Sequence, residues 1–272
     1  MTVLVLGGTG KTGRRVAARL AARGHRVRVG ARSAAPSFDW TDRATWGPEL
    51  EGVDAAYIAY SPDAGFPGAA EAVGGWARRA VAAGVRRLVL LTGRGEAGAV
   101  RTEEAVRATG ADLTVLRAAF FAQNFSEDFL VDMVRGGRVV FCADPGVGEP
   151  FVDAEDIAEV AVAALTGPEH IGRTYDVTGP RLLGFGAAVA EVAAAAGREV
   201  GYTPVPVGAF RDGMVADGVP AGFADPFTAL LGEVLDGRNA HVGDGVRRVL
   251  GREPRDFAAY AAAAAADGVW DV

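Results

Sequence analysis

The amino-acid sequence alternates short apolar runs with longer stretches whose apolar residues recur every three or four positions. The first pattern is typical of buried strands, and the second is typical of helices that bury one face. Glycines such as Gly84 and Gly110 close several of the helical stretches. The predicted strands are 2–6, 26–31, 54–60, 87–92, 112–117 and 139–142, and the predicted helices are 10–23, 68–83, 96–109 and 120–135.

Strands and helices that alternate at this spacing form a parallel sheet with helices on both faces. We therefore predict an α/β fold with a doubly wound, Rossmann-like sheet. After residue 143 the alternation loosens and the helical segments become broken by glycine and proline. Further helices are predicted over 153–166 and 183–196, and further strands over 174–177 and 199–205.

The loosening of the alternation after residue 143 divides the chain into a cofactor-binding part and a substrate-binding part. Residues 1–143 are predicted to form the NAD(P)-binding core, and residues 144–272 a smaller C-terminal α/β substrate lobe. We expect the lobe to interleave with the core in a single structural unit, because no linker or internal repeat separates them.

Composition excludes several classes of protein. Half of the 272 residues are hydrophobic and 23% are charged, as in globular proteins with a sizeable core. A net charge of −6 without a basic tail disfavours nucleic-acid binding. No apolar run reaches the ~18 residues of a membrane span, and no basic leader precedes the first strand. We expect a cytoplasmic protein, either a monomer or a homodimer, without membrane contact.

The strongest local signal is the segment 7–13, Gly-Gly-Thr-Gly-Lys-Thr-Gly, between the first predicted strand and helix. Its spacing is G-x-x-G-x-x-G. Gly7 permits the tight turn, Gly10 the close approach of a pyrophosphate, and Gly13 close packing of helix and strand. The helix N-terminus then offers free N–H groups to the anion. A P-loop is excluded, because Val5 stands where its first glycine would be.

The end of the second predicted strand indicates which dinucleotide binds. An acidic residue there would bind the ribose 2′-hydroxyl of NAD, but this chain has Arg32. A guanidinium can pair with the 2′-phosphate of NADP, assisted by Lys11 or Arg14. We therefore predict NADP(H) as the cofactor.

Several segments together resemble the NmrA-like group of atypical short-chain dehydrogenases, and within it the festuclavine-dehydrogenase-type branch with its bacterial relatives. The likeness extends almost from end to end of the chain. One departure is Ala118, where the group commonly has a proline after the arginine. The matching segments are 7–13, 38–40, 85–92, 113–117 with Phe121 and Asn124-Phe125, 245–248 and 251–257.

The resemblance implies a set of cofactor contacts. These contacts include the phosphate loop and the basic residue for the 2′-phosphate. Further residues would lie near the adenine, along the ribose and toward the nicotinamide. The residues so implied are Gly7, Thr9, Gly10, Lys11, Thr12, Gly13, Arg32, Asp39, Ala59, Tyr60, Thr92, Gly93 and Phe120.

Several kinds of catalytic chemistry are absent from the sequence. The only lysine is Lys11, so the Tyr-x-x-x-Lys pair of ordinary ketone-reducing dehydrogenases cannot exist. No H-E-x-x-H or G-x-S-x-G motif is present, and the single cysteine excludes a cysteine-based zinc site. We predict no metal. Tyr60 is the one tyrosine placed near the cofactor, and it is only a weak candidate for catalysis.

Aromatic residues predict an apolar pocket for a small-molecule substrate. Phe120 and Phe121 follow the fifth predicted strand, at the sheet edge where open α/β sheets bind ligands. Phe121, Phe125 and Phe129 repeat every four residues on one predicted helix, and core packing is the better interpretation of Phe129. The predicted substrate contacts are Phe121, Asn124, Phe125, Phe223 and Phe227.

These observations favour an NADPH-dependent reductase of a small apolar substrate. Hydride transfer to an iminium carbon needs no proton, and transfer to a quinone or enone gives a delocalised anion. A chain without an evident proton donor therefore suits an iminium or conjugated acceptor, as in secondary metabolism. Two alternatives stay open: a non-catalytic NAD(P)-binding regulatory protein, and a non-redox isomerase or cyclase on the same scaffold.

Overall fold

The computed structural model describes residues 1–272, which divide into two compact units. The chain leaves unit 1 after its fifth strand and returns to it twice. The expected functional division after residue 143 stays a prediction. Unit 1 comprises Met1–Ala118, Ala154–Val177 and Asp244–Arg252, and unit 2 comprises Ala119–Asp153, Thr178–Gly243 and Glu253–Val272.

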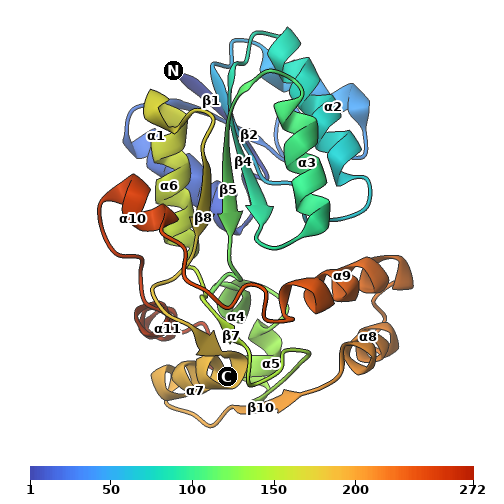
Figure 1. The fold of residues 1–272 in the computed structure, drawn as a ribbon, viewed down its shortest axis with the longest axis vertical. Helices are drawn as coiled ribbons and strands as arrows, with labels where there is room; N and C mark the ends of the chain where they lie inside the picture. The colour runs from blue at the N-terminus through green and yellow to red at the C-terminus, as the bar shows by residue number, and fades with distance from the viewer. The chain divides into compact units, whose positions relative to one another are not determined.

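Unit 1 is built on a six-stranded parallel sheet with the strand order β2-β1-β3-β4-β5-β8 (Figure 1). This sheet confirms the predicted doubly wound, Rossmann-like α/β fold. The change of winding direction between β1 and β3 is where such sheets bind their ligands. The strands are β1 (Thr2–Leu6), β2 (Arg26–Gly30), β3 (Ala55–Ile58), β4 (Arg87–Gly93), β5 (Asp112–Ala118) and β8 (Thr174–Val177).

Helices cover both faces of this sheet (Figure 1). Helices α1 and α6 pack together on one face, α2 and α3 on the other, and α10 packs beside α6 and β8. The helices are α1 (Lys11–Ala22), α2 (Ala69–Ala82), α3 (Ala97–Arg107), α6 (Ala154–Thr166) and α10 (Gly245–Leu250), with 3₁₀ turns η1 (Arg43–Trp46), η2 (Pro48–Leu50) and η3 (Pro168–His170).

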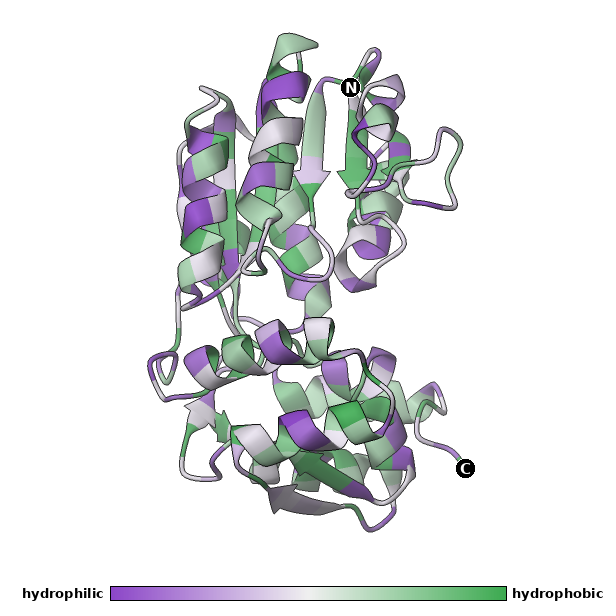
Figure 2. Cartoon of the chain, turned by 90° about the vertical axis from the view of Figure 1, so that its right-hand side faces the viewer, coloured by the Kyte–Doolittle hydropathy of each residue, from purple (hydrophilic) through white to green (hydrophobic).

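The central strands are apolar because helices bury both of their faces. Every residue from Val3 to Leu6 is fully buried, as are Leu88, Val89 and Leu90 on β4. Figure 2 shows these strands as hydrophobic, while polar residues lie along the helices that flank them. Without an alternating pattern, such runs are recognised by their length and by the glycines that bound them.

The sixth strand of the sheet differs from the sequence prediction. Residues 139–142 continue the alternation of strands and helices, but the strand formed there, β6 (Arg138–Phe141), belongs to unit 2. The sixth place in the sheet is taken by β8, which pairs with β5 from Val115↔Thr174 to Ala118↔Val177. Strand pairing over such a distance depends on tertiary contacts, which local periodicity does not record.

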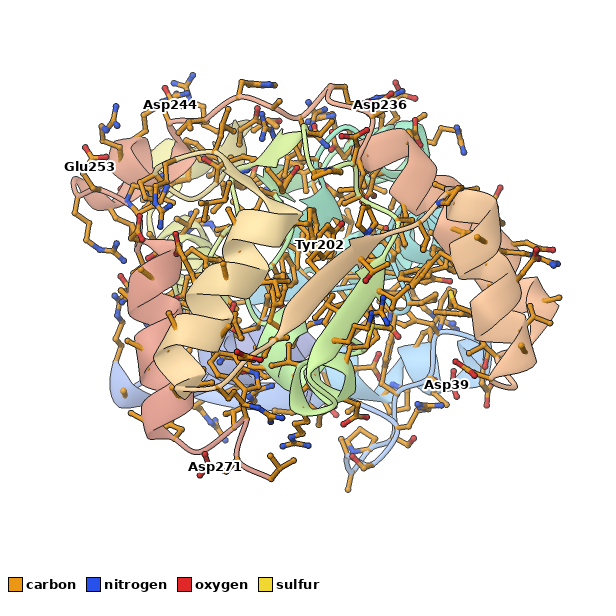
Figure 3. The ribbon with its side chains drawn as sticks, turned by 90° about the horizontal axis from the view of Figure 1, so that it is seen from below. Asp39, Tyr202, Asp236, Asp244, Glu253 and Asp271 are labelled. Atoms are coloured by element: carbon orange, nitrogen blue, oxygen red, sulfur yellow. The ribbon has the colours of Figure 1, made fainter.

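Unit 2 combines two small sheets with helices. Strands β6 and β10 are parallel, and β7 and β9 are antiparallel. Figure 3 shows β10, which carries Tyr202, beside β6. The elements are α4 (Asn124–Glu127), α5 (Val131–Arg135), β6, β7 (Gly148–Glu149), β9 (Leu183–Gly184), α7 (Phe185–Ala196), β10 (Gly201–Pro204), α8 (Val207–Ala216), α9 (Ala221–Val234) and α11 (Phe257–Ala266).

The predicted single helix over 120–135 is wrong. The structure has two short helices there, α4 and α5, separated at Asp128, whose backbone is extended. The Asp128 carboxylate accepts the N–H of Phe129 at 2.8 Å, which offers the backbone an alternative to the helical bond. Phe121, Phe125 and Phe129 therefore do not share one helix face.

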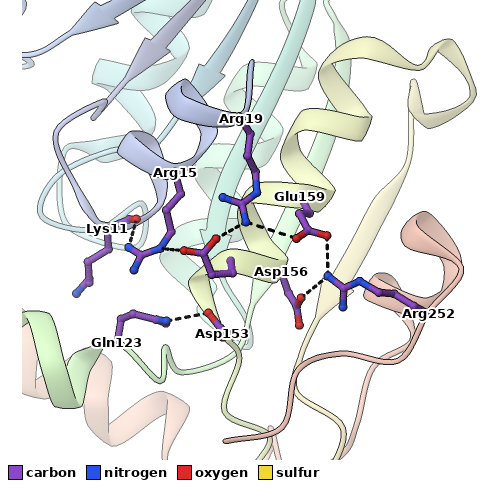
Figure 4. Close-up of polar contacts among 9 residues, drawn as sticks. Lys11, Arg15, Arg19, Gln123, Asp153, Asp156, Glu159 and Arg252 are labelled. Atoms are coloured by element: carbon purple, nitrogen blue, oxygen red, sulfur yellow. Dashed lines mark hydrogen bonds and ion pairs between the residues drawn. The ribbon is translucent and has the colours of Figure 1, made fainter. Parts of the chain in front are cut away.

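A ladder of ion pairs holds α1 against α6 (Figure 4). Arg15 and Arg19 on α1 both pair with Glu155, and Arg19 also lies 3.5 Å from Glu159. Arg252, which follows α10, donates to Asp156 and Glu159, each at 2.7 Å. The ladder thus joins three segments of unit 1 that are far apart in sequence.

Replacing Arg252 tests how much this ladder stabilises unit 1. Arg252→Leu removes the guanidinium that two carboxylates share, one of them the fully buried Asp156. Because the guanidinium is partly exposed, we expect unfolding free energy to fall by about 2–3 kcal/mol, measured by urea titration. Arg248→Leu, on the exposed side of α10, is the matched control and should cost less than about 1 kcal/mol. Equal losses in the two variants would contradict this assignment.

Candidate functional site

Gly7, Gly10 and Gly13 each lack a side chain for a different geometric reason. Gly7 has φ of +69°, and a Cβ there would lie 2.8 Å from the carbonyl oxygen of Ala59. A Cβ on Gly13 would lie only 2.2 Å from the Gly7 oxygen, so α1 packs directly on the loop. Gly10 is exposed, and its Cβ would meet only the Gly7 oxygen, at 3.2 Å. Its missing side chain therefore leaves room for a ligand rather than for the protein.

The loop ends at the N-terminus of α1, whose first residue is Lys11. The N-terminal N–H groups and the helix dipole favour an anion at this point. Arg15 donates to the Lys11 carbonyl at 2.7 Å, which connects this first turn to the ion-pair ladder. Thr9 is exposed, whereas the Thr12 hydroxyl is buried and accepts the Tyr57 hydroxyl at 2.9 Å. Thr12 therefore reaches a ligand only through its backbone.

Arg32 lies in a closed loop after β2. The Ala31 carbonyl accepts the N–H groups of Ala34 and Phe38, and the Ser37 hydroxyl donates to the Arg32 carbonyl at 2.9 Å. The Arg32 side chain is exposed. The loop thus presents a cation at the carboxyl end of β2, beside the phosphate loop.

Asp39 precedes Trp40 in the chain, and Tyr60 packs against the Trp40 ring. The Asp39 carboxylate accepts the Thr41 N–H at 2.8 Å, and this bond and that from the Thr41 hydroxyl lower its pKa. The rings of Tyr60 and Trp40 are 5.1 Å apart, with Tyr60 half-buried. Burial, followed by the charge of Glu71, raises the pKa of Tyr60. Tyr60 is therefore a weaker acid than an ordinary tyrosine.

Thr92 faces the helix layer of unit 1. Its hydroxyl is buried and donates to Glu103 at 3.2 Å. Glu103 also accepts Arg117 through both oxygens, at 2.8 and 2.7 Å, and this bond raises the pKa of Arg117. The Thr92 hydroxyl is therefore committed to the protein, and Gly93, at the end of β4, is half-buried.

Sequence reasoning missed two carboxyl groups at this edge of the sheet. Glu96 precedes α3 and is 6% exposed, and Asp63 follows β3. Burial raises the pKa of Asp63, and this effect outweighs the lowering by the Gly65 N–H and by Glu96. A Cβ on Gly93 would lie 1.6 Å from a Glu96 carboxylate oxygen, so Glu96 lies directly on Gly93. The sequence does place an acidic residue after each of β3 and β4. Because the two are far apart in the sequence, their position at the same sheet edge is not evident from it.

The predicted substrate residues belong to unit 2. Phe125 is fully buried among Phe151, Phe185 and Phe257, so the structure gives its ring a packing role. Phe223 is 37% exposed and stacks on Phe227 at 5.4 Å. Phe121 and Asn124 are half-buried.

The segment that follows β5 is held by polar contacts within unit 2. The Phe120 N–H donates to the buried Glu149 carboxylate at 3.1 Å, and the Phe120 ring packs on Phe185. The Gln123 amide donates to Asp153 at 2.8 Å (Figure 4).

The structure gathers most predicted cofactor residues at the carboxyl ends of β1 to β4 in unit 1, and places Phe120 and the substrate residues in unit 2. No helix combines the length and apolar character that a membrane span requires. No group of three or more histidine, cysteine, aspartate or glutamate side chains is arranged to hold a metal ion.

Comparison with known proteins agrees with this geometry. No family model matches the chain. The uncharacterized oxidoreductase YesF of Bacillus subtilis is 34% identical over 278 residues, covering 97% of this chain and 95% of YesF. The chain belongs to the NmrA-like family of atypical short-chain dehydrogenases.

Other NmrA-like relatives lie near the branch that the sequence resembles. Agroclavine dehydrogenase of Claviceps fusiformis is 28% identical and covers 96% of both chains. Among solved structures, the NADPH-dependent quinone oxidoreductase QOR2 of Escherichia coli, complexed with NADPH, superposes with a TM-score of 0.78. It is 19% identical, and covers 96% of this chain and 99% of that chain. That likeness establishes the NmrA-like fold of this chain.

Gly10→Val tests whether the NmrA-like loop binds a dinucleotide. The valine would occupy the space of the pyrophosphate, so we expect no binding of NADPH or NADH by calorimetric titration. The fold should survive, because a Cβ there would meet only one protein atom, the Gly7 carbonyl oxygen at 3.2 Å, which needs to move by only a few tenths of an ångström. Gly201→Val, where a Cβ meets nothing within 4 Å, is the control and should bind normally. Dinucleotide binding by a folded Gly10→Val protein would show that the loop is only a turn.

Proposed function

We propose that this chain is an NADPH-dependent reductase of a small, largely apolar substrate with an iminium or conjugated acceptor group. The observation that carries the proposal is the phosphate loop beside an exposed guanidinium, Arg32, at the carboxyl end of β2. An adenosine ribose extending from the pyrophosphate toward β2 brings its 2′ position to this cation. A 2′-phosphate gains a charge-assisted hydrogen bond there, which a 2′-hydroxyl does not.

The residues fit the cofactor at other points as well. The backbone around Gly7 and Gly10 would hold the pyrophosphate at the N-terminus of α1. The nicotinamide half would extend away from β2, across the carboxyl ends of β3 and β4, toward Ala59 and Gly93. When bound, the cofactor supplies the hydride, and the protein supplies position and exclusion of water.

The relatives support this reaction class. YesF is an oxidoreductase, agroclavine dehydrogenase acts in alkaloid chemistry by its name, and QOR2 was solved with NADPH and named for quinones. This chain is an NAD(P)H-dependent oxidoreductase of the same family. An iminium or conjugated substrate suits it, because no tyrosine–lysine pair is present to protonate an alkoxide.

The cofactor preference is tested at Arg32. We expect the unmodified protein to bind NADPH more tightly than NADH, and Arg32→Ala to reduce that difference by about 1–3 kcal/mol. Arg26→Ala, at the opposite end of β2, is the matched control and should leave the difference unchanged. Both affinities are read from titrations with NADPH and NADH. Equal affinities in the unmodified protein would contradict the proposed role of Arg32.

Tyr60→Phe tests whether this tyrosine donates a proton during the reaction. Its pKa is raised by burial and by Glu71, so it is poorly suited to give up its proton. We expect kcat to stay within about tenfold of the unmodified enzyme, below the usual ~10²–10⁴-fold contribution of general acid catalysis. A loss of that larger size would identify Tyr60 as the donor.

A further inference from the structure

Strand β3 supports the phosphate loop from its buried side through the side chain of Tyr57. Tyr57 lies within β3 and is fully buried. Its hydroxyl donates to the hydroxyl of Thr12 at 2.9 Å, and Thr12 is itself buried. Thr12 is the second residue of α1, so this bond joins the sheet to the helix end that would receive a pyrophosphate.

The other end of the phosphate loop also meets this part of the chain. Tyr57 pairs with Val5 of β1 in the sheet, and Ala59 follows β3. A Cβ on Gly7 would lie 2.8 Å from the Ala59 carbonyl oxygen, so the two backbones are in close contact. The loop is therefore held at its start by a backbone contact and at its end by the Tyr57 side chain.

The exposed side of the same helical turn is held by a different group. Arg15 donates to the Lys11 carbonyl at 2.7 Å and pairs with Glu155. This contact fixes a carbonyl oxygen, whereas an anion binds the N–H groups, which have no partner within the first turn of a helix. The Tyr57 bond acts on Thr12, one of the residues that carry these N–H groups.

Burial makes the hydroxyl pair a strict constraint. A buried hydroxyl that loses its partner cannot turn to water instead, so breaking the bond carries the full cost of an unpaired polar group. Burial also raises the pKa of Tyr57, so its hydroxyl keeps the proton that it donates. Rotation of the first turn of α1 would separate the two oxygen atoms, and the bond opposes that rotation.

We propose that Tyr57 is a positioning residue of the dinucleotide site, whose hydroxyl holds the first turn of α1, through Thr12, in the orientation that binds the pyrophosphate. This inference rests on the proposed NADPH-dependent function. The pyrophosphate is common to NADPH and NADH, so Tyr57 supports both affinities equally, whereas Arg32 distinguishes the two. A protein without the bond populates the binding orientation less, and its apparent Kd rises in proportion.

Calorimetric titration with NADPH and with NADH tests this role. We expect Tyr57→Phe to raise both Kd values by the same factor, about three- to tenfold, as for the loss of one neutral hydrogen bond. Tyr175→Phe is the matched control, because Tyr175 is a buried tyrosine of the same sheet whose hydroxyl lies 2.9 Å from His170 Nδ1. It should lose comparable stability and keep both affinities. Unchanged Kd values in Tyr57→Phe, or an equal rise in Tyr175→Phe, would overturn the proposal.

A second substitution separates positioning from general stability. Valine has nearly the shape of threonine, so Thr12→Val combined with Tyr57→Phe leaves neither hydroxyl of the pair unpaired. Stability against urea should then recover much of what Tyr57→Phe loses. Affinity for the dinucleotides should stay low, because the bond is missing from both proteins. Recovery of affinity together with stability would show that Tyr57 has only a structural role.

Amide hydrogen exchange, measured by NMR, tests the constraint in the protein without ligand. The Arg14 N–H donates to the Gly10 carbonyl at 3.1 Å and closes the first turn of α1. Tyr57→Phe should speed its exchange relative to the last turn of the helix, and Tyr175→Phe should not. Unchanged exchange at Arg14, or equal acceleration along all of α1, would refute the proposed positioning. Failure of the unmodified protein to bind either dinucleotide would instead refute the proposed function, so the two failures are distinguishable.

Discussion

The contact between the first turn of α1 and the loop before it constrains the whole of unit 1. The backbone at Gly13 lies so close to Gly7 that even a methyl group would overlap its carbonyl oxygen, at 2.2 Å. This contact brings the N-terminal N–H groups of α1 to the carboxyl end of β1, where an anion can bind them. The ion-pair ladder then holds the rest of the helix against α6 through Arg15 and Arg19. Anion binding and helix packing therefore depend on the same backbone contact.

Positive and acidic groups lie at different places along the carboxyl edge of the sheet. A cation, Arg32, follows β2, the helix dipole lies after β1, and two carboxyl groups follow β3 and β4. Full ionisation of Asp63 and Glu96 would place two negative charges on the edge that would receive an anionic dinucleotide. Burial raises the pKa of Asp63, which opposes its ionisation at this edge. The raised pKa of Asp63 is therefore compatible with an anionic ligand at the same edge.

Local patterns predicted the parts of this protein that local chemistry determines. The glycine spacing from Gly7 to Gly13 identified the phosphate loop, and the structure gives Gly7 a close contact with Ala59 and Gly13 a close contact with Gly7. The sixth strand could not be assigned in this way, since β8 is chosen by its pairing with β5 rather than by periodicity. The helix break at Asp128 depends on one side chain competing for a backbone N–H, which an apolar pattern does not register.

Asp63 and Glu96 show the same limit at the level of the site. Asp63 and Glu96 each follow a strand of the sheet, but their separation in the sequence conceals that the fold brings them to the same edge. A tyrosine needs a nearby cation to lower its pKa, and this chain has only Lys11, in the phosphate loop. A carboxylic acid needs the opposite change, a higher pKa, and burial provides it at Asp63. Glycines let these two loops pack closely, since a Cβ on Gly93 would lie 1.6 Å from a Glu96 carboxylate oxygen and one on Gly98 would lie 2.0 Å from the Gly65 oxygen.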